Sequence, residues 1–156
     1  MIEWRDVLIG KDLLYSLAAV IIICYFIPMD INAFTFHFKH ANIFHLFVNA
    51  MALTSVLYKC KLYTLPIAFI LTSLIWQASW NVIGFSGIIF FMWGTRFFYD
   101  IHNTPTKWRH IALSSIPFVA SAIIPRLSIE LHLYPFLIGS VFGLGDYLHT
   151  RYMKKI

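Results

Sequence analysis

Charged residues are scarce in this sequence. Asp, Glu, Lys and Arg make up 12% of its 156 residues, while 60% of the residues are hydrophobic. An ordinary soluble domain carries roughly a quarter charged residues. So few charges leave too little polar surface to cover a globule of this apolarity. The composition therefore predicts an integral membrane protein, and it argues against a small soluble protein with a large core.

Cysteine is also rare, and neither cysteine lies in a metal-binding pattern. Cys24 falls within an apolar run and Cys60 lies between two lysines. A reducing compartment is expected for the second, which argues against a structural disulfide, and neither neighbourhood has the Cys/His clustering of a zinc site. His40 and His45 are a poor helical pair without a carboxylate beside them. We therefore expect no metal and no cofactor.

Long polar tails, low-complexity segments and internal repeats are absent, and the length leaves no room for a second domain. Residues 1–156 are expected to form one domain. The net charge of +5 comes from basic residues scattered singly or in pairs between apolar runs. Scattered charges of this kind set the orientation of a membrane protein, so we expect no nucleic-acid partner.

Six apolar segments are separated by short connections. A bilayer-spanning backbone must satisfy its own hydrogen bonds, so each segment is predicted to be a helix. The expected fold is an all-α, six-transmembrane-helix bundle in which sequence neighbours run antiparallel. The segments are Leu13 to Ile27, Ile43 to Tyr58, Leu62 to Trp76, Ser86 to Phe98, Ile111 to Ile124 and Leu133 to Leu148.

Lys and Arg are concentrated in alternate connections. The N-terminal segment, the Lys59–Lys61 turn, the connection after the fourth segment and the C-terminus are the basic ones. Because cytoplasmic loops carry the excess of Lys and Arg, both termini are predicted to be cytoplasmic. The starts of the second, fourth and sixth helices then lie outside. The expected location is a bacterial-like plasma membrane, as a multi-pass protein with its site facing outward.

The fourth segment is too short to span a bilayer before it reaches Tyr99 and Asp100. The polar stretch from Gln77 to Asn81 precedes it, and non-helical backbone at membrane depth is tolerated where water reaches it. These features predict a recessed, water-filled cavity with Ser86 at its floor. Pro117 and Pro125 flank the outer end of the fifth helix and suggest a bent entry point there.

Ser86 is the candidate nucleophile. A serine hydroxyl needs a base to take its proton, and histidine is the usual base. His132 begins the sixth helix at the same predicted depth, so a Ser86–His132 pair across two helices is expected. Glu130 is the one carboxylate near enough in sequence to orient the imidazole. The pattern therefore predicts a dyad rather than a triad.

Acyl transfer also requires donors for the developing oxyanion. The Ser86 N–H lies at a helix start, where N–H groups are unpaired and the helix dipole favours negative charge. His45 and Asn49 are four residues apart and share a helix face, so both can contribute donors. Gly139 and Gly143 would let the sixth helix approach a neighbour closely. Phe90, one turn after Ser86, could back the histidine ring.

Each motif, taken alone, also has an explanation that involves no catalysis. Gly84-Phe85-Ser86-Gly87 taken alone is a short pattern that recurs by chance. Gly-x-x-x-Gly spacing usually reflects helix packing only. Asp146 is expected to form an ion pair or a cap near the inner end of the sixth helix. The combination of motifs, rather than any one of them, indicates chemistry.

Together these residues resemble the rhomboid intramembrane serine proteases. The resemblance rests on His45-x-x-x-Asn49, on Gly84-x-Ser86-Gly87, and on His132 with a glycine seven residues later. It implies Ser86 as nucleophile and His132 as base, with Asn49, His45 and the Ser86 amide as oxyanion donors. It also implies peptide-bond cleavage in transmembrane segments of membrane proteins, at sites opened by helix-breaking residues in the lipid bilayer.

Two departures from the family keep other functions open. Pro135 stands where the family has a glycine, in what we expect to be the first turn of the helix, and the first outer loop, from Met29 to Asn42, is short. A rhomboid-like protein that binds or escorts membrane helices without cutting them is the second hypothesis. A small transporter is the third, although it predicts polar groups nearer the bilayer centre.

Overall fold

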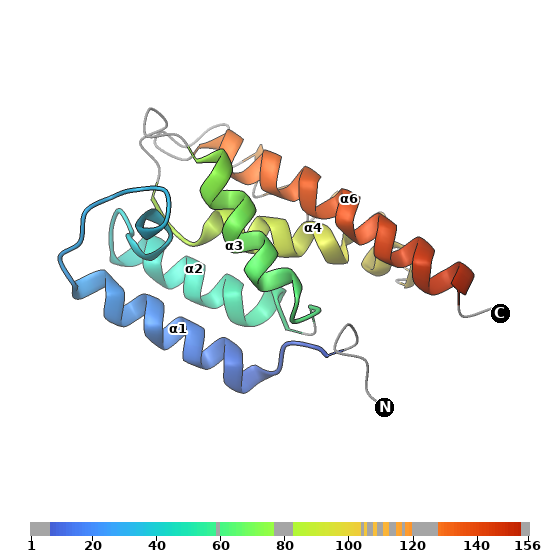
Figure 1. The fold of residues 1–156 in the computed structure, drawn as a ribbon, viewed down its shortest axis with the longest axis horizontal. Helices are drawn as coiled ribbons and strands as arrows, with labels where there is room; N and C mark the ends of the chain where they lie inside the picture. The colour runs from blue at the N-terminus through green and yellow to red at the C-terminus, as the bar shows by residue number, and fades with distance from the viewer. Residues whose placement is uncertain are drawn as a thin grey trace.

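The computed structural model describes residues 7–58, 60–76, 83–103 and 128–153, together with residues 105, 108, 111–112, 115–116 and 118–119. The described part is helical, with one isolated bridge between Leu8 and Lys61 in place of a sheet. The named α-helices are α1 (Lys11–Phe26), α2 (Ile43–Val56), α3 (Thr64–Ile75), α4 (Ser86–Asn103) and α6 (Ile129–Met153), and Thr35–Phe38 forms the short 3-10 helix η2. Figure 1 shows α1 and α2 side by side, with α4 between α2 and α6.

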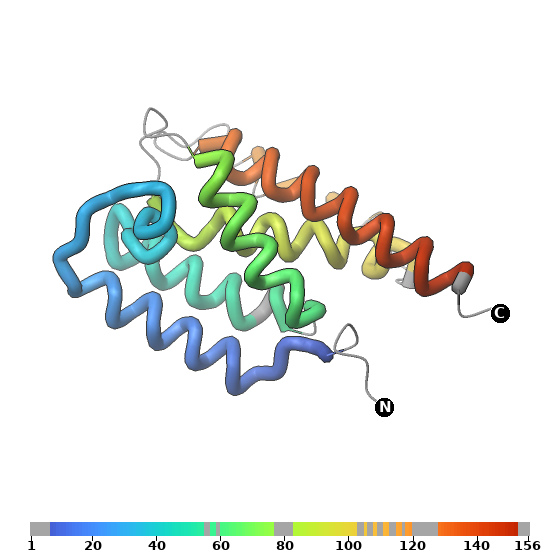
Figure 2. The backbone as a smooth tube through the Cα atoms, viewed as in Figure 1, coloured from blue at the N-terminus to red at the C-terminus, as the bar shows by residue number. Residues whose placement is uncertain are grey.

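Helix α4 is the centre of the fold. It contacts α2, α3 and α6, and its contact with α6 is the most extensive between any two described elements. The smooth backbone trace in Figure 2 shows α3 crossing α4 and ending beside the start of α6, while α1 lies against α2 at the opposite edge. The functional candidates at the start of α4 are therefore surrounded by several helices.

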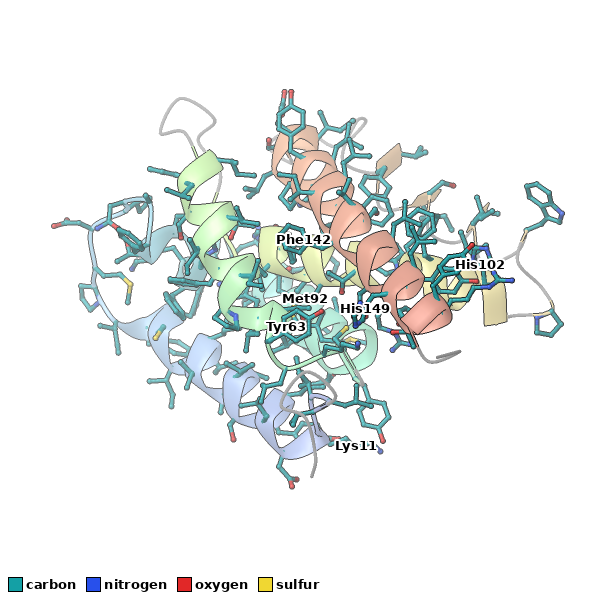
Figure 3. The ribbon with its side chains drawn as sticks, turned by 45° about the vertical axis from the view of Figure 1, so that its right-hand side comes forward. Lys11, Tyr63, Met92, His102, Phe142 and His149 are labelled. Carbon is teal, nitrogen blue, oxygen red and sulfur yellow. The ribbon has the colours of Figure 1, made fainter. Side chains whose placement is uncertain are left out.

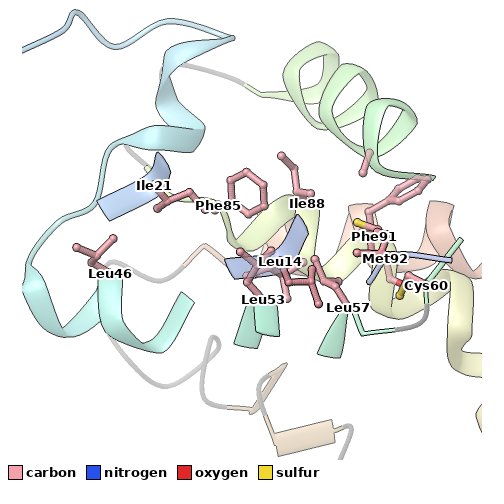
Figure 4. Packing of buried hydrophobic residues seen from close by; sticks show 13 residues of the cluster. Leu14, Ile21, Leu46, Leu53, Leu57, Cys60, Phe85, Ile88, Phe91 and Met92 are labelled. Atoms are coloured by element: carbon pink, nitrogen blue, oxygen red, sulfur yellow. The ribbon is translucent and has the colours of Figure 1, made fainter. Parts of the chain in front are cut away.

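The apolar core follows from helical spacing. Leu14 and Ile21 are seven residues apart on α1, and Leu46 and Leu53 repeat this spacing on α2. Residues seven apart lie on one helix face, so each helix turns these side chains into the same buried cluster. Figure 4 shows them packed with Phe85, Ile88, Phe91 and Met92.

Glycines bring α4 and α6 into backbone contact. A Cβ atom on Gly139 would lie 2.0 Å from the carbonyl oxygen of Phe91, and one on Gly143 would lie 2.2 Å from that of Thr95. On the α4 side, a Cβ on Gly94 would lie 2.3 Å from the carbonyl oxygen of Phe136. The close approach predicted from Gly139 and Gly143 is confirmed, and Gly94 is its partner on α4.

The predicted six-transmembrane-helix bundle is wrong. The helical positions agree closely with the apolar segments, but among the described residues no helix combines the length and apolarity that a membrane span requires. Helices α1, α2 and α3 have 16, 14 and 12 residues, short of the roughly 20 needed. Helix α4 is 18 residues long and includes Arg96 and Asp100. Helix α6 is 25 residues long and includes charged residues at both ends.

The predicted location in a membrane is also wrong, because it depended on the six-helix bundle. A multi-pass protein of the plasma membrane, with cytoplasmic termini and an outward-facing site, requires spans that the described helices do not provide. The orientation predicted from the alternation of Lys and Arg assumed membrane spans, so it is not supported by the described helices. The polar approach at Gln77–Asn81 and the prolines Pro117 and Pro125 lie outside the described residues.

Candidate active site

Ser86 and His132 meet at the interface of α4 and α6. The His132 Nε2 atom lies 3.1 Å from the Ser86 Oγ atom, and both side chains are buried. The Phe90 ring, one turn after Ser86, stacks on the His132 imidazole with centroids 4.3 Å apart and an interplanar angle of 19°. The ring contact fixes the plane of the imidazole, and the hydrogen-bond distance aligns it with the hydroxyl. The arrangement matches the nucleophile–base geometry of acyl-transfer enzymes.

Helix α6 begins three residues before His132. The Ser128 hydroxyl accepts a hydrogen bond from the Leu131 N–H at 3.2 Å and donates one to the Glu130 carboxylate at 2.7 Å. Such a cap stabilises a helix start by about 1 kcal/mol. Glu130, the one carboxylate considered for orienting the imidazole, is thus bonded to the capping serine.

Pro135 does not lie in the first turn of α6, contrary to expectation. The helix starts at Ile129, so Pro135 is its seventh residue and is an interior proline. Proline has no N–H and cannot bond the carbonyl four residues earlier, which here belongs to Leu131. The interruption lies beside His132 on the chain, yet the imidazole still reaches Ser86.

The turn before Ser86 requires glycine. Gly84 has φ +133°, a backbone conformation that residues with a side chain rarely adopt. Its N–H donates to the carbonyl of Phe36 at 2.8 Å. A Cβ atom there would lie 2.8 Å from His45 Cε1 and 3.2 Å from Asn49 Nδ2. The glycine therefore lets the loop pass directly against the two side chains predicted to donate to an oxyanion.

Asn49 and His45 are held on α2 by a local cap. Asn42 is the N-cap residue of α2, and its side chain accepts a hydrogen bond from the His45 N–H at 2.8 Å. Asn49 follows one turn later and is 4% exposed, and its Nδ2 has no hydrogen-bond partner in the described part of the chain. A buried N–H without an acceptor costs roughly 1–3 kcal/mol. A substrate oxyanion would supply that acceptor.

The first turn of α4 adds backbone donors. The first N–H groups of a helix have no intrahelical partner and lie at the positive end of the helix dipole. The α4 helix starts at Ser86 itself. The nucleophile, the unpaired amide of Asn49 and these N–H groups therefore gather around the Gly84 turn.

Burial sets the protonation state of the candidate base. Desolvation, with a smaller contribution from the charge of His45, lowers the pKa of His132 from 6.5 to about 4. A neutral imidazole can accept a proton, whereas an imidazolium cannot. The geometry therefore holds His132 in the base form at neutral pH.

A second buried serine–histidine pair was not predicted. His37 Nε2 lies 3.0 Å from the Ser73 Oγ atom, joining η2 to α3. The pair is 36 residues apart in sequence, and no motif links the two positions. Ser73 lies near the end of α3, which stops at Ile75. A helix C-terminus presents carbonyls and disfavours negative charge, so this pair lacks the oxyanion environment of Ser86.

His37 couples the fold to pH. Burial lowers its pKa from 6.5 to about 3, so the unfolded chain binds a proton at this residue more readily than the folded chain does. The stability contributed by the neutral imidazole is complete above about pH 6.5 and is lost as the pH falls toward 3.

Within the described residues, no group of three or more His, Cys, Asp or Glu could hold a metal ion.

No family model matches the chain, and neither a curated protein nor a solved structure does. The resemblance to rhomboid proteases therefore depends on the residues of the chain itself.

Proposed function

We propose that the chain is a serine endopeptidase that acts through a Ser86–His132 dyad, with apolar polypeptide segments as its substrates. The observation that carries the proposal is the 3.1 Å distance between His132 Nε2 and Ser86 Oγ at a buried interface. This geometry supports the dyad chemistry. The choice of peptide bonds, and of transmembrane segments of membrane proteins as substrates, comes from the rhomboid resemblance.

In the proposed reaction, Ser86 Oγ attacks the carbonyl carbon of the scissile bond while His132 Nε2 takes the hydroxyl proton. The carbonyl oxygen becomes an oxyanion, which accepts hydrogen bonds from the Ser86 N–H, from Asn49 Nδ2 and from His45. His132 then gives its proton to the leaving amine as the C–N bond breaks. A water molecule, activated by the same imidazole, releases the acyl group and restores the serine.

The unpaired Asn49 amide supports the oxyanion assignment. An oxyanion donor stabilises the transition state only if it is already oriented and is not bonded elsewhere. Asn49 Nδ2 is buried without a partner in the described part of the chain. Removal of one such donor typically costs about 100-fold or more in rate. Asn49→Ala should therefore lower acylation strongly while Ser86 remains in place.

A serine-directed fluorophosphonate probe tests the nucleophile. Ser86→Ala and His132→Ala should each abolish labelling of the folded protein. The chain offers a matched control, because Ser73 and His37 form a buried pair of the same chemistry at 3.0 Å. Ser73→Ala should leave labelling intact. Labelling that survives Ser86→Ala, or that is lost only in Ser73→Ala, would show that the dyad is assigned to the wrong pair.

Cleavage of a polypeptide distinguishes a peptidase from another acyl hydrolase. The substrate would be a tagged protein with a single apolar helix containing a helix-breaking residue. The expected result is one or a few cuts within that segment by the parent chain and none by Ser86→Ala. Hydrolysis of simple esters without any cutting of the polypeptide would retain the dyad but contradict the peptidase assignment.

A further inference from the structure

Two adjoining cavities lie at the end of the α4–α6 pair away from Ser86. The first, of about 330 Å³, is lined by residues of α4 and α6, by the start of α3 and by Lys61. The second, of about 450 Å³, shares Tyr63, Phe142 and Asp146 with the first and continues along α6 past Gly145. Figure 3 labels Tyr63, Phe142 and His149, which line this second cavity. Arg96 lies ten residues after Ser86, about 15 Å along the helix, so these cavities are separate from the dyad.

The first cavity is lined by two cations, each of which is ion-paired with a carboxylate. Lys61 and Arg96 line it, and Asp146 is the one carboxylate among the described residues that do so. Lys61 Nζ lies 2.8 Å from both carboxylate oxygens of Asp146, so that pair is internally neutral. The Asp100 carboxylate pairs with Arg96 at 2.8 Å but does not line the cavity.

Arg96 uses only part of its hydrogen-bonding capacity within the described structure. Its Nη1 donates to the Tyr58 carbonyl at 2.6 Å and its Nη2 donates to Asp100 at 2.8 Å. A guanidinium carries five N–H groups in a fixed plane, so these two bonds hold its position and leave further donors for a ligand. An oriented guanidinium of this kind suits a carboxylate or a phosphate.

The second cavity has an apolar wall. Val141 and Phe142 line it and are 70% and 44% exposed. Gly145 lines it as well, and a Cβ atom placed on Gly145 would meet nothing within 4 Å. The two cavities thus present the Arg96 guanidinium at one end and an open apolar wall along α6. Their volumes fall in the range of about 300–1,000 Å³ that small-molecule sites occupy.

We propose that these joined cavities bind an anionic single-chain amphiphile, with its acidic head on the Arg96 guanidinium and its acyl chain along Val141, Phe142 and Gly145. The shared chemistry is a carboxylate or phosphate on an unbranched hydrocarbon chain. A free fatty acid and a lysophospholipid or alkyl phosphate are its two sources. The site is independent of the dyad, so its occupancy does not depend on Ser86.

Calorimetric titration with decanoate, below its micelle concentration, tests the site. Saturable binding of one molecule per chain is expected. Gly145→Leu should abolish it, because the new side chain enters the space of the acyl chain without clashing with the helix. Gly10→Leu is the matched control, since a Cβ there also meets nothing within 4 Å and the position lies outside both cavities. Decanoate bound equally by both leucine variants would overturn the proposal, as would the absence of saturable binding.

Two further ligands and one variant test the head-group assignment. Arg96→Gln should weaken decanoate binding at least about tenfold, because a hydrogen bond to a charged group contributes about 1.5 kcal/mol or more. Neutral decanol should bind more weakly than decanoate, and equal affinity would refute the anionic assignment. Decyl phosphate binding more tightly than decanoate would identify phosphate as the preferred head, whereas the reverse order would identify carboxylate. Acetate and inorganic phosphate, which lack the chain, should not saturate the site.

Discussion

Gly139→Ala tests whether the backbone contact between α4 and α6 places His132 beside Ser86. The added Cβ would lie 2.0 Å from the Phe91 carbonyl oxygen. An ordinary contact of a Cβ atom begins at 3.4 Å, so the helices must separate locally by more than 1 Å. The obstacle is backbone, which cannot rotate away as a side chain would. Overpacking of this kind costs about 1–3 kcal/mol, and the rigid obstacle favours the upper end.

Helix propensity acts in the opposite direction. Replacing a helical glycine by alanine stabilises a helix by about 1 kcal/mol. The net effect of Gly139→Ala is therefore a loss of about 2 kcal/mol. Gly145→Ala is the matched control on the same helix, because its Cβ would meet nothing within 4 Å. That variant should gain up to about 1 kcal/mol.

Urea unfolding followed by circular dichroism measures both variants against the parent chain. The expected difference between them is about 3 kcal/mol, or roughly 6–12 °C in melting temperature for a domain of this size. His132 lies two helical turns before Gly139, so Gly139→Ala should also slow fluorophosphonate labelling of Ser86, whereas Gly145→Ala should not. Equal stabilities and equal labelling rates for the two variants would refute the close helix contact.

Three further predictions concern the Gly84 turn, the buried His37 and the Asn42 cap of α2. Gly84→Ala should destabilise the fold by about 1–3 kcal/mol and suppress labelling, because φ is +133° and the Cβ would meet His45; Gly87→Ala, whose Cβ meets only side chains at 3.3 Å or more, should be nearly neutral in the same unfolding assay. Lowering the pH from 7 to 5 should cost about 2 kcal/mol at His37, whose pKa of about 3 lies below its unfolded value, and an unchanged pH dependence in His37→Gln would contradict this. Asn42→Ala should cost about 1 kcal/mol in urea unfolding, and Asn42→Ser should restore most of it if the side chain acts as the cap of α2.

The helices could be predicted from the sequence, but their environment could not. Five of the six apolar segments correspond to named helices within a few residues, because apolar periodicity and short connections determine them locally. The membrane assignment used total composition instead. A span needs one long uninterrupted apolar helix, whereas here the apolar residues are divided among short helices and among longer ones that contain charges.

The helix positions of the candidate site residues were predictable because they depend on local sequence. Ser86 follows a glycine turn and begins a helix, and Asn49 follows His45 by one helical turn on α2. The Asn42 cap could also have been predicted, since asparagine directly before an apolar run is a common helix start. The Ser73–His37 pair and the role of Gly94 could not, because each depends on contacts between distant elements that no spacing encodes.

The presence of two buried serine–histidine pairs shows why distance alone does not identify a nucleophile. Ser73 Oγ and Ser86 Oγ are equally close to an imidazole, at 3.0 and 3.1 Å. Their positions on the helices differ. Ser73 lies two residues before the end of α3, among carbonyl groups, while Ser86 begins α4, among N–H groups. Negative charge that formed on attack would be stabilised by the second environment and opposed by the first, so the helix terminus favours Ser86 as the proposed nucleophile.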